Sequence, residues 1–195
     1  MEDRAVPGTL SGTKVAFMMA NEGVEQVELT RPWDAVTHAG GTPELIAPEH
    51  GAVQAFNHLD HGGTFQAERT TAEIDPDDYD GLMLPGGVAN PDRLRQDEKA
   101  VSFVKAMIDK AKPVAVICHA PWTLVEADAV RGRTLTSWPS LATDIRNAGG
   151  RWVDLEVVVC RNGPNVLVTS RGPADLDAFC ASMIEVLAAG AHRAA

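Results

Sequence analysis

The residues that could do chemistry are Cys118 and His119, which are adjacent in the chain. The apolar run 114–117 precedes them, and Pro121 follows near the start of a predicted helix. Such a run is typical of a parallel strand that is buried on both faces. A cysteine at a strand-to-helix turn projects its sulfur out of the sheet, and the helix N-terminus favours its thiolate. Cys118 is therefore a candidate nucleophile.

The alternative for each cysteine is simple packing, because free cysteine is among the most buried residue types. Cys160 ends the apolar run 155–159 and Cys180 falls in the predicted C-terminal helix, so we expect both to pack in the core. Three widely spaced cysteines form neither a disulfide framework nor a zinc pattern. They indicate a reducing cytoplasm, in which Cys118 stays a thiol.

The composition is that of one globular domain, with 195 residues of which 45% are hydrophobic. We expect a domain over 13–190, with an N-terminal extension 1–12 and a tail 191–195. The formal net charge of -10 argues against a nucleic-acid partner. The sequence has no run of eighteen apolar residues and its start lacks an apolar signal core, so we expect no membrane span.

Strand and helix patterns alternate along the chain. The segment 51–71 is irregular and rich in histidine, and we expect short strands or a hairpin there. The alternation predicts an α/β fold, with a mostly parallel sheet and helices on both faces. The expected strands are 14–20, 42–47, 81–84, 114–117, 153–160 and 166–170, and the expected helices are 27–39, 97–111, 141–148, 173–189 and one that begins at 120–124.

Three polar clusters follow predicted strands, at 21–25, 85–87 and 118–119. In open α/β sheets, ligands bind outside the carboxyl ends of the strands. We therefore expect the three clusters to converge on one crevice.

With these segments in view, the chain resembles the PfpI/ThiJ family, the branch of the class I glutamine amidotransferase-like superfamily that includes the parkinsonism-associated deglycase. The resemblance implies a single-domain, flavodoxin-like three-layer α/β/α sandwich with a nucleophile elbow and no cofactor. It rests on four short segments in a specific order, 21–29 (NEGVEQVEL), 84–87 (LPGG), 117–121 (ICHAP) and 170–176 (SRGPADL).

The resemblance also implies roles for individual residues. Cys118 matches the family nucleophile and His119 the histidine beside it. Glu25 resembles the buried carboxyl group that hydrogen-bonds the sulfur; we expect it to be protonated and the pKa of Cys118 to be well below about 8.5. The backbone N–H groups of Gly87 and His119 would form the oxyanion hole, next to Gly86.

Ala120 stands where the family usually has glycine, and it would narrow the crevice. Trp122, beside the nucleophile, is expected to line the substrate site. Asp92 falls where the family places an acid that reaches the histidine of a neighbouring subunit. This match implies a homodimer or a higher oligomer.

Each role has a structural alternative. Glu25 could cap the helix that starts near Gln26, and Asp92 could cap a short helix at Arg93. The pair 86–87 could form only a tight turn. His50, His58 and His61 could offer ligands to zinc, but no further ligand spacing supports a metal site.

We therefore expect a cytoplasmic, cysteine-dependent hydrolase and stress-response protein. The resemblance supports peptidase, glyoxalase and deglycase chemistry, all of which begin with thiolate attack on an electrophilic carbonyl of a small compound or a peptide. The alternative is a thiol redox sensor or stress chaperone that uses the same Cys118 without turnover.

Overall fold

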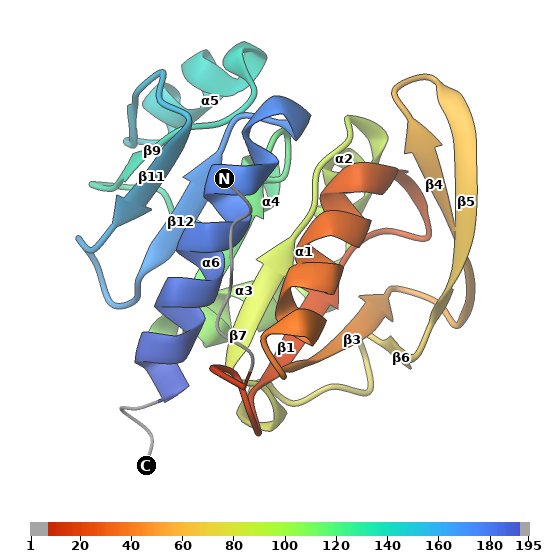
Figure 1. The fold of residues 1–195 in the computed structure, drawn as a ribbon. Helices are drawn as coiled ribbons and strands as arrows, with labels where there is room; N and C mark the ends of the chain where they lie inside the picture. Colours follow the sequence, from red (N-terminus) through yellow and green to blue (C-terminus); the bar gives the residue numbers. More distant parts are fainter. Residues whose placement is uncertain (1–7, 192–195) are drawn as a thin grey trace.

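A seven-stranded sheet forms the centre of the computed structural model, which describes residues 8–191 (Figure 1). Its strands are β1 (Lys14–Met18), β3 (Thr42–Ala47), β6 (Arg69–Thr70), β7 (Gly81–Leu84), β8 (Val114–Ile117), β11 (Val157–Cys160) and β12 (Leu167–Ser170). They are ordered β11-β12-β8-β7-β1-β3-β6, and only β11 runs antiparallel to its neighbour. The predicted mostly parallel sheet is confirmed.

The central strands are apolar because both faces of the sheet are covered. Every residue of β7, β8 and β12 is buried. Helices α1 (Gln26–His38) and α6 (Leu176–Ala191) contact each other on one face (Figure 1). The other face carries α2 (Ala89–Leu94), α3 (Glu98–Asp109), α4 (Pro121–Glu126) and α5 (Ala142–Asn147). The α/β/α sandwich is thus confirmed.

A separate three-stranded sheet stands beside the main one, built from β2 (Glu22–Glu25), β4 (Gly51–Asn57) and β5 (Asp60–Ala67). The antiparallel pair β4–β5 is the hairpin expected within 51–71. Its tip turns at His58, which has a positive φ of 60°. Figure 1 shows this hairpin rising beside α1 and α2.

Two predicted elements differ in detail. Pro32 predicts a kink in, or a later start of, the helix expected over 27–39, but helix α1 begins at Gln26 and continues through Pro32. The strand expected over 153–160 is shorter than predicted, because residues 153–156 form no strand and only Val157–Cys160 form β11. The residues just before this range form β10 (Arg151–Trp152), which pairs with β9 (Thr134–Leu135). The break follows from the polar residues in the run, since Asp154 turns to the guanidinium of Arg171 at 2.9 Å.

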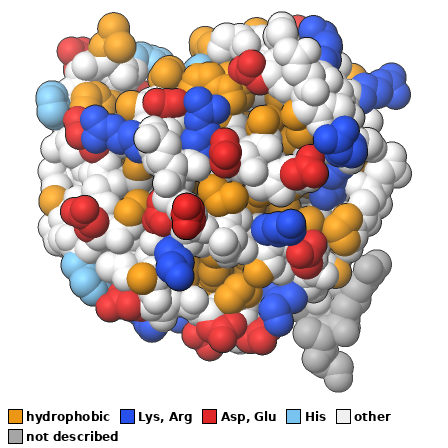
Figure 2. Space-filling view, turned by 180° about the vertical axis from the view of Figure 1, so that it is seen from behind, with side chains coloured by type: hydrophobic (Ala, Val, Ile, Leu, Met, Phe, Trp, Pro, Cys, Tyr) orange, Lys and Arg blue, Asp and Glu red, His pale blue; other side chains and the backbone are white. Residues whose placement is uncertain are grey.

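The expected boundaries at 1–12 and 191–195 fall mostly outside the described residues. Within 8–12, Leu10 is fully buried and its N–H donates to the carbonyl of Ala39 at 2.8 Å. No helix in the described part is long and apolar enough to cross a membrane. On the face opposite to that of Figure 1, acidic and basic side chains are interspersed (Figure 2).

Candidate active site

Cys118 lies on a strained turn between β8 and α4. Its φ of +63° is in the left-handed region, which residues with a side chain rarely adopt. Two backbone hydrogen bonds hold it there. The N–H of Cys118 donates to the carbonyl of Ser170 at 3.1 Å, and its carbonyl accepts from the N–H of Trp138 at 2.9 Å. The expected nucleophile elbow is therefore present, with its strain supported by neighbouring segments.

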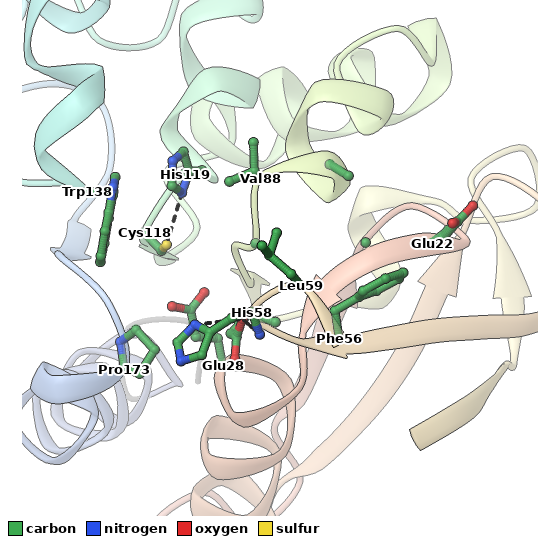
Figure 3. A pocket seen from close by; sticks show the side chains of 14 residues that line it. Glu22, Glu28, Phe56, His58, Leu59, Val88, Cys118, His119, Trp138 and Pro173 are labelled. Atoms are coloured by element: carbon green, nitrogen blue, oxygen red, sulfur yellow. Dashed lines mark hydrogen bonds and ion pairs between the residues drawn. The ribbon is translucent and has the colours of Figure 1, made fainter. Parts of the chain in front are cut away.

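The imidazole of His119 lies against the sulfur. Its Nδ1 is 3.2 Å from Sγ of Cys118 (Figure 3). Its Nε2 is 3.4 Å from Oγ of Ser140. The ring also stacks on Trp138, with centroids 5.7 Å apart. Burial lowers the pKa of His119 to about 4, so the ring is neutral at pH 7 and Nδ1 can accept a proton. Ser140 is a ring contact that the sequence analysis did not identify.

The buried carboxyl group beside Cys118 belongs to Glu28, although the sequence analysis assigned it to Glu25. A side-chain hydrogen bond joins Glu28 to Cys118. Glu28 Oε2 accepts from the N–H of Gly86 at 2.9 Å, and Oε1 has no nitrogen or oxygen partner in the described structure. Glu25 Oε2 instead accepts from the N–H of His58 at 3.0 Å. Glu25 also makes no side-chain cap for α1, which excludes the capping alternative.

Helix geometry explains why Glu28 reaches the sulfur. Glu28, Pro32 and Val36 are spaced four apart and, with Leu29, form the buried stripe of α1. Glu28 is the acidic member of this stripe and is 0% exposed. The sequence signal for Glu28 was its position on the apolar face of the predicted helix. A buried acid needs a specific partner, so an acidic residue on that face indicates a functional or paired carboxyl group.

Burial sets the protonation of this pair. It raises the pKa of Glu28 from 4.5 to about 8, so this carboxyl group keeps its proton at pH 7. Burial also raises the pKa of the Cys118 thiol, and repulsion from an ionised Glu28 adds to the effect. The backbone of Gly87 and His119 acts in the opposite direction, but more weakly. The lowered thiol pKa expected from the sequence is therefore not found in the resting site.

Gly86 and Gly87 pass through spaces in which no side chain fits. A Cβ on Gly86 would lie 2.6 Å from both Cβ of Cys118 and Oε2 of Glu28. A Cβ on Gly87 would lie 2.2 Å from the carbonyl oxygen of Gly23, and its φ is +83°. The pair 86–87 therefore does more than form a tight turn, because the backbone of Gly87 also hydrogen-bonds Cys118.

We expect Gly86→Ala to destabilise the fold by about 1 to 3 kcal/mol and to disturb the elbow, because its methyl group overlaps Cys118 and Glu28. Urea unfolding and the rate of Cys118 alkylation would measure both effects. Gly132→Ala is a suitable control, since nothing lies within 4 Å of a Cβ at Gly132 and only its φ of +72° is unfavourable. Wild-type stability and alkylation in Gly86→Ala would contradict the tight packing.

A pocket of about 380 Å³ opens above the sulfur. The hairpin tip forms part of its wall, with Leu59 94% exposed (Figure 3). The three polar clusters that the sequence analysis placed at strand ends do converge here. The lining residues are Glu22, Gly23, Glu25, Glu28, Phe56, His58, Leu59, Gly87, Val88, Ala89, Cys118, His119, Trp138 and Pro173.

Two expected lining residues lie outside this pocket. The indole N–H of Trp122 donates to Asp144 at 2.9 Å, so Trp122 flanks His119 from behind, while Trp138 lines the pocket. Ala120 is buried in the core with a φ of -58°, and its N–H donates to the carbonyl of Ile117. Ala120 is accordingly part of the turn and not of the pocket wall.

Asp92 lies inside α2, which begins at Ala89, so it does not cap a helix at Arg93. Its Oδ1 accepts from Arg95 at 2.9 Å, and the side chain is 50% exposed. The guanidinium of Arg95 also lies over the ring of Trp122, 5.1 Å from its centroid. An exposed carboxylate at this position remains accessible to a second molecule.

The histidines of 50–61 make separate contacts. His50 pairs with Glu73 at 2.9 Å, His58 Nδ1 is 3.9 Å from Glu25, and His61 packs on Phe56. Over residues 8–191, no group of three or more histidine, cysteine or acidic side chains could hold a metal ion.

The fold and this site define an α/β protein of the nucleophile-elbow class. The chain belongs to the DJ-1/PfpI family, whose family model matches residues 13–186. The resemblance noted in the sequence is thereby confirmed.

Curated relatives match nearly the whole chain. "Deglycase PH1704" of Pyrococcus horikoshii is 41% identical, over 89% of this chain and 99% of the relative. "Protein/nucleic acid deglycase 2" of Escherichia coli is 37% identical, over 90% and 98%. "Putative cysteine protease YraA" of Bacillus subtilis is 35% identical, over 89% and 98%. These names divide between deglycase and protease.

Solved structures agree with the fold. A two-domain protein of Anabaena variabilis, which contains DJ-1/ThiJ/PfpI-like and ferritin-like domains, matches with a TM-score of 0.81 and 30% identity. The match covers 89% of this chain and 47% of that one. A ThiJ/PfpI domain protein of Brachyspira murdochii gives a TM-score of 0.81 at 19% identity, over 92% and 98%.

Proposed function

We propose that this protein is a PfpI-type, cysteine-dependent hydrolase that acts on reactive carbonyl compounds, with deglycase chemistry as its main activity. The observation that carries the proposal is the thiol of Cys118 at the base of the pocket, 3.2 Å from a neutral His119. The names of the relatives from Pyrococcus horikoshii and Escherichia coli support the deglycase activity. The name of the Bacillus subtilis relative supports peptidase chemistry as the second candidate.

The first step is attack on the carbonyl carbon. Sγ of Cys118 forms the C–S bond, its proton passes to Nδ1 of His119, and the carbonyl π electrons move to oxygen. Backbone N–H groups of Gly87 and His119 stabilise the oxyanion. Because burial disfavours a free thiolate at Cys118, proton transfer accompanies the attack instead of preceding it.

Glu28 is protonated and therefore adds no negative charge beside the sulfur during this step. An ionised carboxylate at Glu28 would oppose the charge that develops on Cys118. The pocket volume of about 380 Å³ suits a small carbonyl adduct or one modified side chain. We place the protein in the cytoplasm, where Cys118 stays reduced.

The test compares wild type and Cys118→Ser on methylglyoxal, on a methylglyoxal-modified amine and on a peptide panel. Release of the free amine by wild type, with no release by the variant, is the expected result. Peptide cleavage without amine release would favour the peptidase. No turnover of any substrate would overturn the proposed function.

We further propose that Asp92 orients His119 of a second subunit, so that the active unit is a homodimer. Its half-exposed carboxylate supports this role. Asp92→Asn is near-isosteric and should retain the fold and the dimer, but it should lower turnover at least about tenfold. Asp128→Asn is a matched control, because Asp128 also pairs with an arginine three residues later, Arg131. Full activity of Asp92→Asn, or an active monomer in sedimentation, would contradict this role.

A further inference from the structure

Arg133 is a buried cation that forms no ion pair with any carboxylate of the described residues. It directly precedes β9 and is only 3% exposed. Its Nη1 donates to Oδ1 of Asn165 at 2.5 Å, and Nη2 donates to the carbonyl oxygens of Asn165 at 2.8 Å and Cys160 at 3.3 Å. Its Nε has no partner, and within residues 8–191 no carboxylate forms an ion pair with this guanidinium.

The surrounding turn closes over the guanidinium group. A Cβ on Gly163 would lie 3.3 Å from its Cζ, so Arg133 is covered by backbone on that side. A desolvated charge of this kind is strongly unfavourable unless it is paired with an anion. Neutral amide and carbonyl oxygens satisfy part of the donor set but do not neutralise the charge.

The side chain that can supply the missing anion is Cys160, whose thiol is hydrogen-bonded to Arg133. Strands β9 and β11 lie side by side (Figure 1). Nη2 of Arg133, just before β9, donates to the carbonyl oxygen of Cys160 at the end of β11. We propose that Cys160 and Arg133 form a second reactive thiolate site, which a small hydroperoxide oxidises to a sulfenic acid.

The local chemistry favours ionisation. Burial raises the pKa of Cys160, but hydrogen bonds with the backbone of Thr134 and Asn162, together with the hydrogen bond and charge of Arg133, outweigh it, so that this pKa is lowered overall. In its neutral form the thiol donates to the carbonyl oxygen of Asn162 at 3.7 Å. Cys160 is 5% exposed, but it directly precedes the exposed turn 161–164. This turn is the only segment that we expect to move to admit a small oxidant.

This site lies at the opposite end of the sheet from the elbow. Cys160 pairs with Leu167, which pairs with Val114 at the start of β8, whereas Cys118 follows the end of β8. Oxidation of Cys160 is therefore distinct from chemistry in the pocket and independent of the proposed function.

In the proposed step, the Cys160 thiolate attacks the terminal oxygen of the hydroperoxide. The S–O bond forms, the O–O bond breaks, and the leaving hydroxide or alkoxide takes a proton from water. Sulfur loses two electrons, and the peroxide gains them. The oxygen of the resulting sulfenic acid provides an acceptor for the donors of Arg133, including the unpartnered Nε.

The test uses Cys118→Ser, so that Cys160 and Cys180 are the remaining thiols. Iodoacetamide alkylation at pH 6 to 10, followed by peptide mass spectrometry, measures each rate in the folded protein. We expect Cys160 to react at least tenfold faster than Cys180, with an apparent pKa below the free value of about 8.5. One equivalent of hydrogen peroxide followed by dimedone should label Cys160.

Arg133→Gln should remove this reactivity, whereas Arg131→Gln, at an exposed arginine two residues away, should retain it. Circular dichroism checks that each variant is folded. If Arg133→Gln does not fold, the pH profile of the Arg133-containing protein decides alone. An apparent pKa of Cys160 at or above about 8.5, a Cys160 rate no higher than that of Cys180, or undiminished reactivity in folded Arg133→Gln would overturn the proposal.

Discussion

Cys118→Ser is expected to lower turnover of the carbonyl substrate by at least about 10³-fold while the fold is retained. The serine hydroxyl occupies nearly the same space and can keep the hydrogen bond with Glu28. It is a far weaker nucleophile than sulfur, because its proton is much harder to remove. His119 accepts the thiol proton in the proposed step, but burial lowers its pKa to about 4, so it is too weak a base to remove the less acidic proton of a serine hydroxyl. Steady-state kinetics of purified protein, with thermal melting alongside, measures the effect.

Cys160→Ser is the matched control, since Cys160 lies at the other end of the sheet from the pocket. It should keep wild-type turnover. Residual activity of Cys118→Ser within tenfold of wild type would mean that another group attacks the carbonyl. Loss of activity in both variants would point to a general requirement for intact packing.

Glu28→Gln is expected to change how stability depends on pH. The pKa of Glu28 is about 8 in the folded protein and 4.5 in an unperturbed side chain. Between these values the folded state holds a proton that the unfolded state releases. The contribution of Glu28 to stability is therefore fully present below pH 4.5 and falls by about 1.4 kcal/mol per pH unit until pH 8. Glutamine carries no such proton and can still accept from the N–H of Gly86.

Urea unfolding of wild type and Glu28→Gln at pH 5, 6, 7 and 8 tests this expectation. The stability of the variant relative to wild type should rise steadily over that range. Cys118→Ser, which leaves Glu28 buried, should retain the wild-type slope. Parallel profiles for wild type and Glu28→Gln would show that Glu28 is ionised in the folded protein at neutral pH.

The fold was predictable because its signals are local. Apolar runs such as 114–117 mark elements whose alternation permits few topologies. The loss of strand structure over 153–156 was not predictable. It depends on Arg171, which is close to Asp154 only in the folded chain.

The site was predictable where it depends on neighbours in sequence. Cys118, His119 and the glycine pair 86–87 lie on turns that their own segments specify. The choice of Glu28 over Glu25 depends on how α1 is rotated about its axis against the sheet, which long-range packing sets. Long-range packing also decides which tryptophan lines the pocket. Trp138 comes from a distant segment and lines it, whereas Trp122, close to Cys118 in sequence, faces Asp144.

The pocket is lined by two different sheets. His58 and Leu59 reach the pocket from the small sheet, whereas Cys118 and His119 belong to the main one. The tip can therefore be lengthened, shortened or exchanged without altering the backbone that holds the sulfur. For protein engineering, we therefore expect changes in the hairpin tip to alter which substrates enter the pocket more than how Cys118 reacts. Relatives with the same elbow and different tips would then differ in what they admit and share how they react.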